Sequence, residues 1–300
     1  MRARLLALLA PFALLLASPA GALALNINEN YKPQNEFKLE PWITIQIGGV
    51  DLSITKAVMY VFVACGLTIL VLTYVAKRMQ QRPGRLQVVV EGYYGLIETI
   101  TKGNMEGAMV RKWFPFLATV FVFIWFSNML GYLPLPTNTE HKVDIFGMQI
   151  PSLALYAATA NLAVPLALTL VVWFSYHIEG FRAKGVIGFY KGLIPAGTEG
   201  AMRIPIFFIE IISDFVRIVS LSVRLFANIL AGHLLILFMG GGLVVLLNLA
   251  IFGSLILGAI TGVMAVAFFI FEVGLVATLQ AFIFTTLSAI YLGGAVSAEH

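Results

Sequence analysis

The chain has 300 residues, of which 60% are hydrophobic and 11% are charged. Ordinary soluble domains carry about 25% charged residues, so this composition excludes a soluble globular protein and indicates a polytopic membrane protein. The formal net charge of +4 does not indicate nucleic-acid binding, because the basic residues lie in loops between apolar runs, as the positive-inside rule requires. The sequence has no glycine-rich phosphate loop and no Cys/His metal cluster, so we expect no nucleotide, cofactor or metal to bind this chain.

Residues 1–24 have the pattern of a secretory signal peptide. Two arginines precede an apolar stretch, and the segment ends on the small-residue sequence Ala-Leu-Ala at 22–24. We expect cleavage after this sequence, with retention as a short anchor as the alternative. Residues 25–54 are polar with an excess of acidic side chains. They are predicted to form an external N-terminal tail.

Three ordinary membrane spans and one surface helix are predicted next. The first span covers residues 55–75 and is followed by four basic residues, which mark the cytoplasmic side. Residues 86–110 place apolar side chains on one helical stripe, so they are predicted to form an amphipathic helix on the membrane or against another subunit. The second and third spans cover 113–133 and 152–176. The loop between them has no basic excess and is predicted external, whereas the basic loop after the third span is predicted cytoplasmic.

Two longer apolar runs follow, 206–239 and 243–292, separated by three glycines at 240–242. The second run has about 50 residues, or roughly 75 Å as a helix, over twice the hydrocarbon thickness of about 30 Å. It therefore either folds back on itself or lies strongly tilted, and hydropathy leaves both possibilities open. The predicted fold class is an all-α polytopic membrane protein, with residues 55–300 forming a single transmembrane helical domain.

The first long run contains one arginine, Arg224, deep in apolar sequence. An arginine near a bilayer centre costs from about 2.5 to more than about 10 kcal/mol, so we expect Arg224 to have a function and to face a polar partner or an aqueous cavity. Asp214 and Arg217 could be no more than an ion pair near the cytoplasmic end. The polar residues of the run recur every three or four positions, which places them on one helical face. They are Glu210, Ser213, Asp214, Arg217, Ser220, Arg224 and Asn228.

Polar residues are scarcer in the second long run. Glu272 has no cation near it in the sequence. His233, on the opposite side of its helix from Arg224, must serve a different surface and is a plausible partner for Glu272 across the glycine hairpin. Acid and histidine groups inside membranes are typical of proton relays. Gln280 lies two turns beyond Glu272.

Three motifs resemble the a subunit of rotary F-type ATP synthase. The first is Leu221-Ser-Val-Arg224-Leu-Phe-Ala-Asn228, followed by Ala231-Gly-His233. Residues 279–285 with Tyr291-Leu292 are similar to the C-terminal helix of that family, and Phe114-Pro-Phe116 with Ser127-Asn128, Gly131 and Pro134 is similar to its middle span. The resemblance covers most of 86–292. In many members an acid occupies the position of His233 and a histidine lies near Glu272, so this chain exchanges the two types and keeps an acid/histidine pair.

The resemblance implies a non-catalytic stator that lies beside a ring of c subunits, with two offset aqueous half-channels. It implies long, strongly tilted helices for the last two runs, and b-type peripheral stalk subunits and the lipid bilayer as partners. The expected location is an energy-coupling membrane, the bacterial plasma (inner) membrane. Arg224 would be the cation that separates the half-channels. Glu210, Ser213 and Asp214 would line the cytoplasmic half-channel, and Asn128, Asn228, His233, Glu272 and Gln280 the external one.

The physical chemistry of the residues agrees with such a role. A carboxylate in lipid is stable only when protonated, because desolvation disfavours its charged form. Arginine stays charged at any reachable pH, so Arg224 would force proton release on one side and block a direct leak. The alternative is a stand-alone ion-coupled secondary transporter, although the lack of an internal repeat disfavours inverted-repeat transporters. A scaffold would leave Arg224 unexplained, and the coupling ion, H⁺ or Na⁺, stays open.

Overall fold

The computed structural model describes residues 41–43, 46–47, 50–51, 53–132, 143–145, 148–150, 157–194, 200–239 and 251–296. The predicted signal peptide and most of the predicted external tail lie outside the described residues. The chain divides into two compact units. One comprises Met1–Lys38, Thr137–Ser152 and Gly232–Phe271, and the other comprises Leu39–Pro136, Leu153–Ala231 and Glu272–His300.

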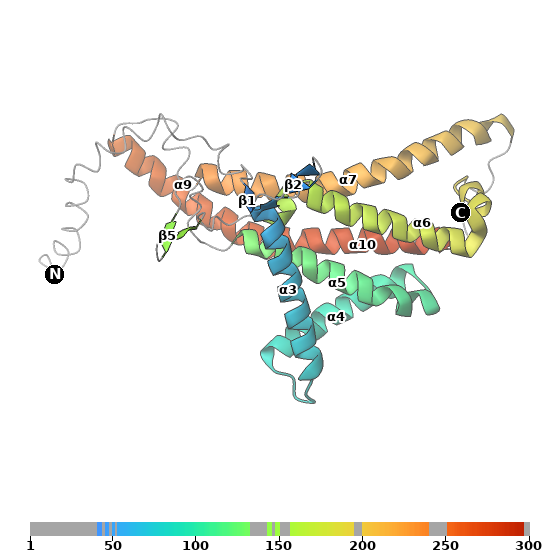
Figure 1. Cartoon of the computed structure of the whole chain (residues 1–300), viewed down its shortest axis with the longest axis horizontal. Helices are drawn as coiled ribbons and strands as arrows, with labels where there is room; N and C mark the ends of the chain where they lie inside the picture. The colour runs from blue at the N-terminus through green and yellow to red at the C-terminus, as the bar shows by residue number, and fades with distance from the viewer. Residues whose placement is uncertain are drawn as a thin grey trace, which may run out of the picture. The chain divides into compact units, whose positions relative to one another are not determined.

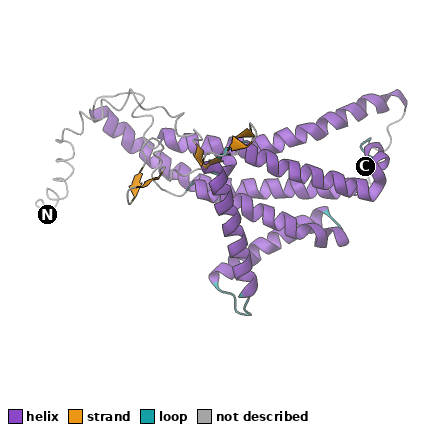
Figure 2. Cartoon of the chain, viewed as in Figure 1, coloured by secondary structure: helices purple, strands orange, loops and turns teal. Residues whose placement is uncertain are grey.

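Helices make up nearly all of the described chain (Figures 1 and 2). They are α3 (Lys56–Lys77), α4 (Arg85–Asn104), α5 (Ala108–Gly131), η2 (Ala158–Ala160), α6 (Ala163–Lys191), η3 (Gly200–Met202), α7 (Arg203–Leu237), α9 (Ile251–Phe271), the π-helical turn η5 (Glu272–Val276) and α10 (Ala277–Val296). The described strands form three short antiparallel pairs: β1 (Pro41–Ile43) with β4 (Ile54–Thr55), β2 (Gln46–Ile47) with β3 (Val50–Asp51), and β5 (Val143–Ile145) with β6 (Met148–Ile150).

Four of the described helical segments are long and apolar enough to cross a membrane: Lys56–Lys77, Ala108–Gly131, Ala163–Lys191 and Gly253–Val296. The prediction of an all-α polytopic membrane protein is confirmed at this level. The predicted amphipathic helix corresponds to α4, where Lys102 and Glu98 form an ion pair of 2.7 Å. α7 is not among the four segments, and it carries the polar stripe seen in the sequence.

Within the larger unit, α10 packs against α5 and α6, and both α3 and α4 contact α5. Figure 1 shows α3 running steeply across α5, α6 and α10. Small residues allow the closest approaches, as is common between membrane helices. A Cβ at Gly131 would overlap Ala157, and a Cβ at Gly293 would overlap the carbonyl oxygen of Asn104. This packing places α10, with its polar side chains, directly against α4, α5 and α6.

The third span differs from its predicted bounds of 152–176. The helix begins at Ala163 and continues to Lys191. Pro165 explains the later start, because proline is tolerated in the first turn of a helix but breaks its interior. The helix bends at Gly185, whose φ of 70° lies in the left-handed region that glycine adopts without strain. Residues predicted as a cytoplasmic loop are thus partly helical.

The last apolar run does not fold back within its described part. Gly253–Val296 is one segment of 44 residues. Its regular helix is interrupted only by the π-helical turn Glu272–Val276. Of the two possibilities that hydropathy left open, a hairpin inside this segment is therefore excluded.

Candidate ion-translocation site

Asp214 is the centre of a polar cluster between α6 and α7. The indole nitrogen of Trp173 donates a hydrogen bond to Oδ2 of Asp214 at 2.9 Å, and the hydroxyl of Tyr176 donates to Oδ1. The Nε2 atom of His177 lies 3.4 Å from Oδ2, and a guanidinium nitrogen of Arg217 lies 3.8 Å from Oδ1. Each carboxylate oxygen therefore has two partners, which compensates the burial of a residue that is only 8% exposed.

Helical spacing explains how two helices build this cluster. On α6, Trp173, Tyr176 and His177 are separated by three and four positions, so they share one face. On α7, Asp214 and Arg217 are also three positions apart. The ion pair that the sequence suggested for these two residues is present, but it is one part of a larger network.

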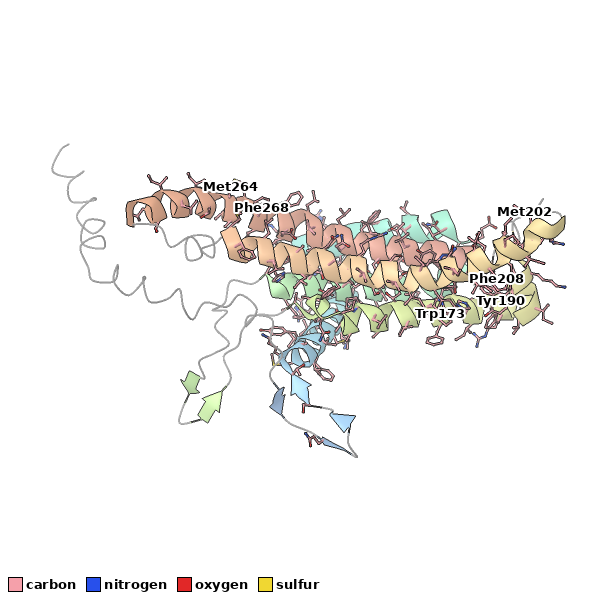
Figure 3. All side chains as sticks on the ribbon, turned by 90° about the horizontal axis from the view of Figure 1, so that it is seen from above. Trp173, Tyr190, Met202, Phe208, Met264 and Phe268 are labelled. Atoms are coloured by element: carbon pink, nitrogen blue, oxygen red, sulfur yellow. The ribbon has the colours of Figure 1, made fainter. Side chains whose placement is uncertain are left out.

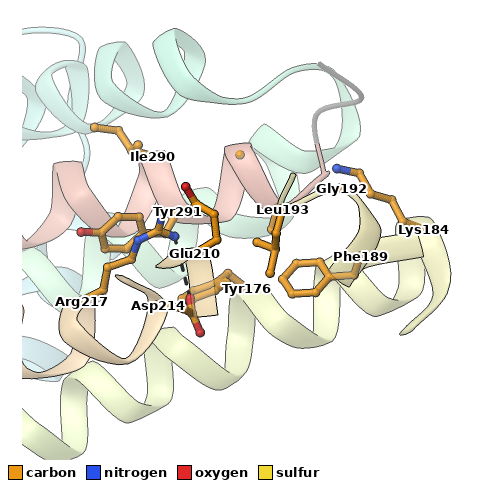
Figure 4. Close-up of a pocket in the computed structure, with 12 residues that line it drawn as sticks. Tyr176, Lys184, Phe189, Gly192, Leu193, Glu210, Asp214, Arg217, Ile290 and Tyr291 are labelled. Atoms are coloured by element: carbon orange, nitrogen blue, oxygen red, sulfur yellow. Dashed lines mark hydrogen bonds and ion pairs between the residues drawn. The ribbon is translucent and has the colours of Figure 1, made fainter. Parts of the chain in front are cut away.

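A cavity of about 400 Å³ adjoins the cluster (Figure 4). The guanidinium of Arg217 lies 5.3 Å from the ring centre of Tyr291 on α10, and a dashed line in Figure 4 joins it to Asp214. Glu210 and Lys184 also line this cavity. The space is therefore bordered by two acids and two bases.

A second cavity, of about 340 Å³, also adjoins the cluster. It is lined by Trp173, His177 and Tyr190 from α6 and by Asp214 and other residues from α7. Figure 3 shows Trp173 and Tyr190 on α6 beside α7. Asp214 is the charged residue that lines both cavities.

Arg224 lies ten positions beyond Asp214 on α7 and has an exposed side chain. Leu225 and Ile229 on the same helix are buried, with exposed fractions of 1% and 0%. Val219 and Val223 flank the arginine on the open side and are exposed. Among the described residues, no ion pair or hydrogen bond involves the Arg224 guanidinium. The arginine thus stands on an apolar surface of the chain rather than in its core.

Glu272 occupies the first position of the π-helical turn and is buried. The hydroxyl of Tyr132 donates a hydrogen bond to its Oε2 at 3.0 Å. Asn128 is fully buried nearby on α5, where its Nδ2 donates to the carbonyl oxygen of Ala277 at 3.2 Å and its Oδ1 accepts from Thr159 at 2.7 Å. π-helical turns inside α-helices occur frequently at functional sites. Here the side chain of Asn128 connects α5 to Ala277, the first residue of α10 after the turn.

The comparisons with known proteins agree with one another. Residues 58–293 match the family model described as ATP synthase A chain. The chain belongs to the ATP synthase A chain family. The resemblance inferred from the three motifs is confirmed, and with it the prediction that this is a non-catalytic proton-channel subunit of the complex, because subunit a of ATP synthase is such a subunit.

Curated relatives include the ATP synthase subunit a of Parvibaculum lavamentivorans, which is 33% identical over 272 residues and is matched over 89% of this chain and 94% of the relative. The corresponding protein of Paramagnetospirillum magneticum is 34% identical over 264 residues, covering 88% of this chain and 98% of the relative. That of Rubrobacter xylanophilus is 32% identical over 265 residues, covering 87% and 91%. These matches give the stand-alone transporter no support.

The predicted site residues of this family member fall into separate groups. Glu210 and Asp214 meet at the first cavity, whereas Ser213 and Asn228 are half-buried on α7 and line neither of the two cavities. Gln280 is buried on α10. His233 and Glu272 belong to different compact units, so their pairing stays a prediction.

Sequence reasoning missed the partners that other helices supply. His177, Tyr176 and Trp173 contact Asp214 although they lie more than 35 positions away, and Tyr132 contacts Glu272 across 140 positions. Aromatic residues near span ends usually pack or mark the membrane interface. His177 was the one available signal, because a histidine inside a span is rare.

Proposed function

We propose that this chain is the ion-conducting stator of a rotary ATP synthase and that its α7 faces a ring of c subunits. The observation that carries the proposal is the exposure of Arg224 among exposed apolar residues of α7. A permanent cation on a surface of this kind is costly in lipid. It becomes favourable when a carboxylate of a neighbouring subunit reaches it within the membrane.

In this proposal the ring carboxylates cross the lipid in the protonated, neutral form. A carboxylate that reaches Arg224 favours its ionised form and releases its proton, because the guanidinium is a fixed positive charge. Arg224 also prevents the proton from passing straight between the two half-channels. Rotation of the ring is then the route that remains, and each translocated charge is worth about 2.3 kcal/mol at 100 mV.

The two half-channels are assigned to different polar groups. Glu210, Ser213 and Asp214 would line the cytoplasmic one, which the cavity beside Arg217 supports. Asn128, Asn228, His233, Glu272 and Gln280 would form the external one. The contacts of Asn128 favour a role in holding α10 in place over direct contact with water. The C-terminal part of α6 carries three basic residues, Arg182, Lys184 and Lys191. They support a cytoplasmic location for that end of the helix.

Placement of the ring can be tested by disulfide cross-linking in a background in which Cys65, the single cysteine, is replaced by serine. Val223→Cys should form a disulfide with a cysteine placed at the membrane centre of a c subunit, because Val223 is 41% exposed beside Arg224. Leu225→Cys is the matched control, since Leu225 is buried within this chain. Absence of cross-links from Val223→Cys in assembled complexes, or equal cross-linking from both positions, would contradict the proposed ring-facing surface.

A further inference from the structure

His177 contacts two polar groups at once, one with each ring nitrogen. It is 5% exposed, and its Nδ1 atom lies 2.9 Å from the carbonyl oxygen of Trp173 while its Nε2 atom faces Asp214. A carbonyl oxygen only accepts, so the Nδ1 contact requires a hydrogen on Nδ1. A hydrogen bond between Nε2 and Oδ2 of Asp214, which lie 3.4 Å apart, needs one more proton, carried either by Nε2 or by the carboxyl group.

The cluster therefore offers two adjacent residues, His177 and Asp214, between which one proton can pass. Two of the other partners of Asp214 cannot play this part. Trp173 has no dissociable proton at ordinary pH, and Arg217 stays charged at any reachable pH. Histidine is the side chain that ordinarily changes its charge between pH 5 and 8.

The cavities that the two residues line give the proton transfer a direction. His177 lines the second cavity and does not line the first, whereas Asp214 lines both. Glu210 lines the first cavity and does not line the second. A proton that moves from His177 to Asp214 thus passes from one cavity to the other without crossing apolar packing.

We propose that His177 and Asp214 form a proton-transfer pair that joins the two cavities in series within the cytoplasmic half-channel. The inference rests on the proposed function and deepens it. The proton leaves Nε2 of the imidazolium and binds Oδ2 of Asp214, so the imidazole and the carboxyl group both become neutral. Asp214 then gives the proton to water or Glu210 in the first cavity, and water in the second cavity protonates His177 again.

Aromatic and charged groups surround the pair. The rings of Phe181 and Phe189 pack around the imidazole at 5.7 Å and 5.2 Å between centres. They exclude water from that side of the ring. The titratable and charged groups that face the pair or share its cavities are Tyr176, Lys184 and Tyr190 from α6, Glu210 and Arg217 from α7, and Tyr291 from α10.

The test uses membrane vesicles that contain the whole complex, after removal of the soluble ATPase part. Passive proton conduction is driven by a potassium diffusion potential and measured as the pH on the cytoplasmic face is varied from about 5 to about 8, the range in which a histidine changes charge. His177→Gln can still donate a hydrogen bond to Asp214 but cannot carry the proton. It should lower conduction by about tenfold or more and remove the pH step, since positioned proton carriers contribute effects of that order or larger.

Two further variants separate proton transfer from positioning. Asp214→Asn should give the same loss, and the double variant should be no worse than either single one, because both act on one step. Trp173→Phe removes a hydrogen bond to the same carboxylate oxygen but offers no proton. It should lower conduction without removing the pH step. His177→Asn replaces His177→Gln if the latter does not assemble.

Wild-type conduction with a wild-type pH profile in assembled His177→Gln overturns the proton-transfer pair. So does an equal loss in Trp173→Phe with the same change of profile, because that result assigns the residue a positioning role only. Arg224→Ala is measured beside these variants. Coupled pumping that survives in Arg224→Ala would contradict the proposed function itself, whereas failure of the histidine prediction with Arg224 still required would overturn the pair alone.

Discussion

The hydroxyl of Tyr132 donates a hydrogen bond to Oε2 of Glu272, and both residues are buried. Glu272 begins the π-helical turn, so the bond ties the end of α5 to the one irregular turn of the last helical segment. Asn128 holds the same segment one residue after that turn, at Ala277. Asn128 on α5 and Tyr132, the residue that follows α5, therefore hold Glu272 and the start of α10 in place.

Removing this hydroxyl tests whether the orientation of Glu272 matters. Tyr132→Phe keeps the ring but leaves a buried carboxyl oxygen without this donor, which costs about 1–3 kcal/mol. We expect a severalfold lower rate of ATP synthesis in membrane vesicles, with the complex assembled. The control is Tyr93→Phe, which removes a hydroxyl that donates to the carbonyl oxygen of Ala118 far from Glu272. Equal effects of the two variants on synthesis would mean that Tyr132 contributes packing only.

The exchanged acid and histidine give a second prediction. If His233 and Glu272 share one polar passage, the double exchange His233→Glu with Glu272→His should preserve more proton pumping than either single substitution does. The measurement is ATP-driven quenching of a pH-sensitive dye in inverted vesicles. Losses that simply add in the double variant would show that the two residues act independently.

Topology gives a third prediction. The charge pattern of the loops predicts that Thr137 is external and that Ala183, on the distal part of α6, is cytoplasmic. With Cys65 replaced by serine, a membrane-impermeant thiol reagent added to whole cells should label Thr137→Cys and not Ala183→Cys. The pattern should reverse in inverted vesicles. Labelling of both positions from one side would contradict the three-span arrangement.

The sequence predicted those helices whose positions follow from their own residue pattern. Apolar runs located α3 and α5 closely, and the stripe of 86–110 located α4. The predicted start of α6 was wrong because hydropathy does not register that Pro165 favours the first turn of a helix. The π-helical turn Glu272–Val276 was not predicted, because its sequence carries no pattern that is specific to a π-helix.

The candidate site could be predicted from the sequence only where a residue stands out from its own segment. Glu210, Asp214 and Arg224 stand out because charged residues in apolar sequence are costly. Their partners do not stand out, because Trp173, Tyr176 and Tyr132 resemble ordinary packing residues until tertiary structure brings them to a carboxylate. Contacts over such sequence separations depend on how α5, α6 and α10 pack, which a single sequence does not encode locally.

The central claim is that Arg224 acts as a permanent cation between two half-channels, and Arg224→Lys tests it most directly. Lysine keeps a positive charge but loses its proton more readily when desolvated and lacks the planar guanidinium. Arg224→Ala, which removes the charge entirely, is measured with it. The measurement is ATP synthesis by membrane vesicles, with assembly and ATP hydrolysis checked in the same preparation. We expect both variants to hydrolyse ATP but to lose synthesis almost completely, and Arg224→Ala to let protons pass without rotation. Near-normal synthesis in assembled Arg224→Ala membranes would contradict the account.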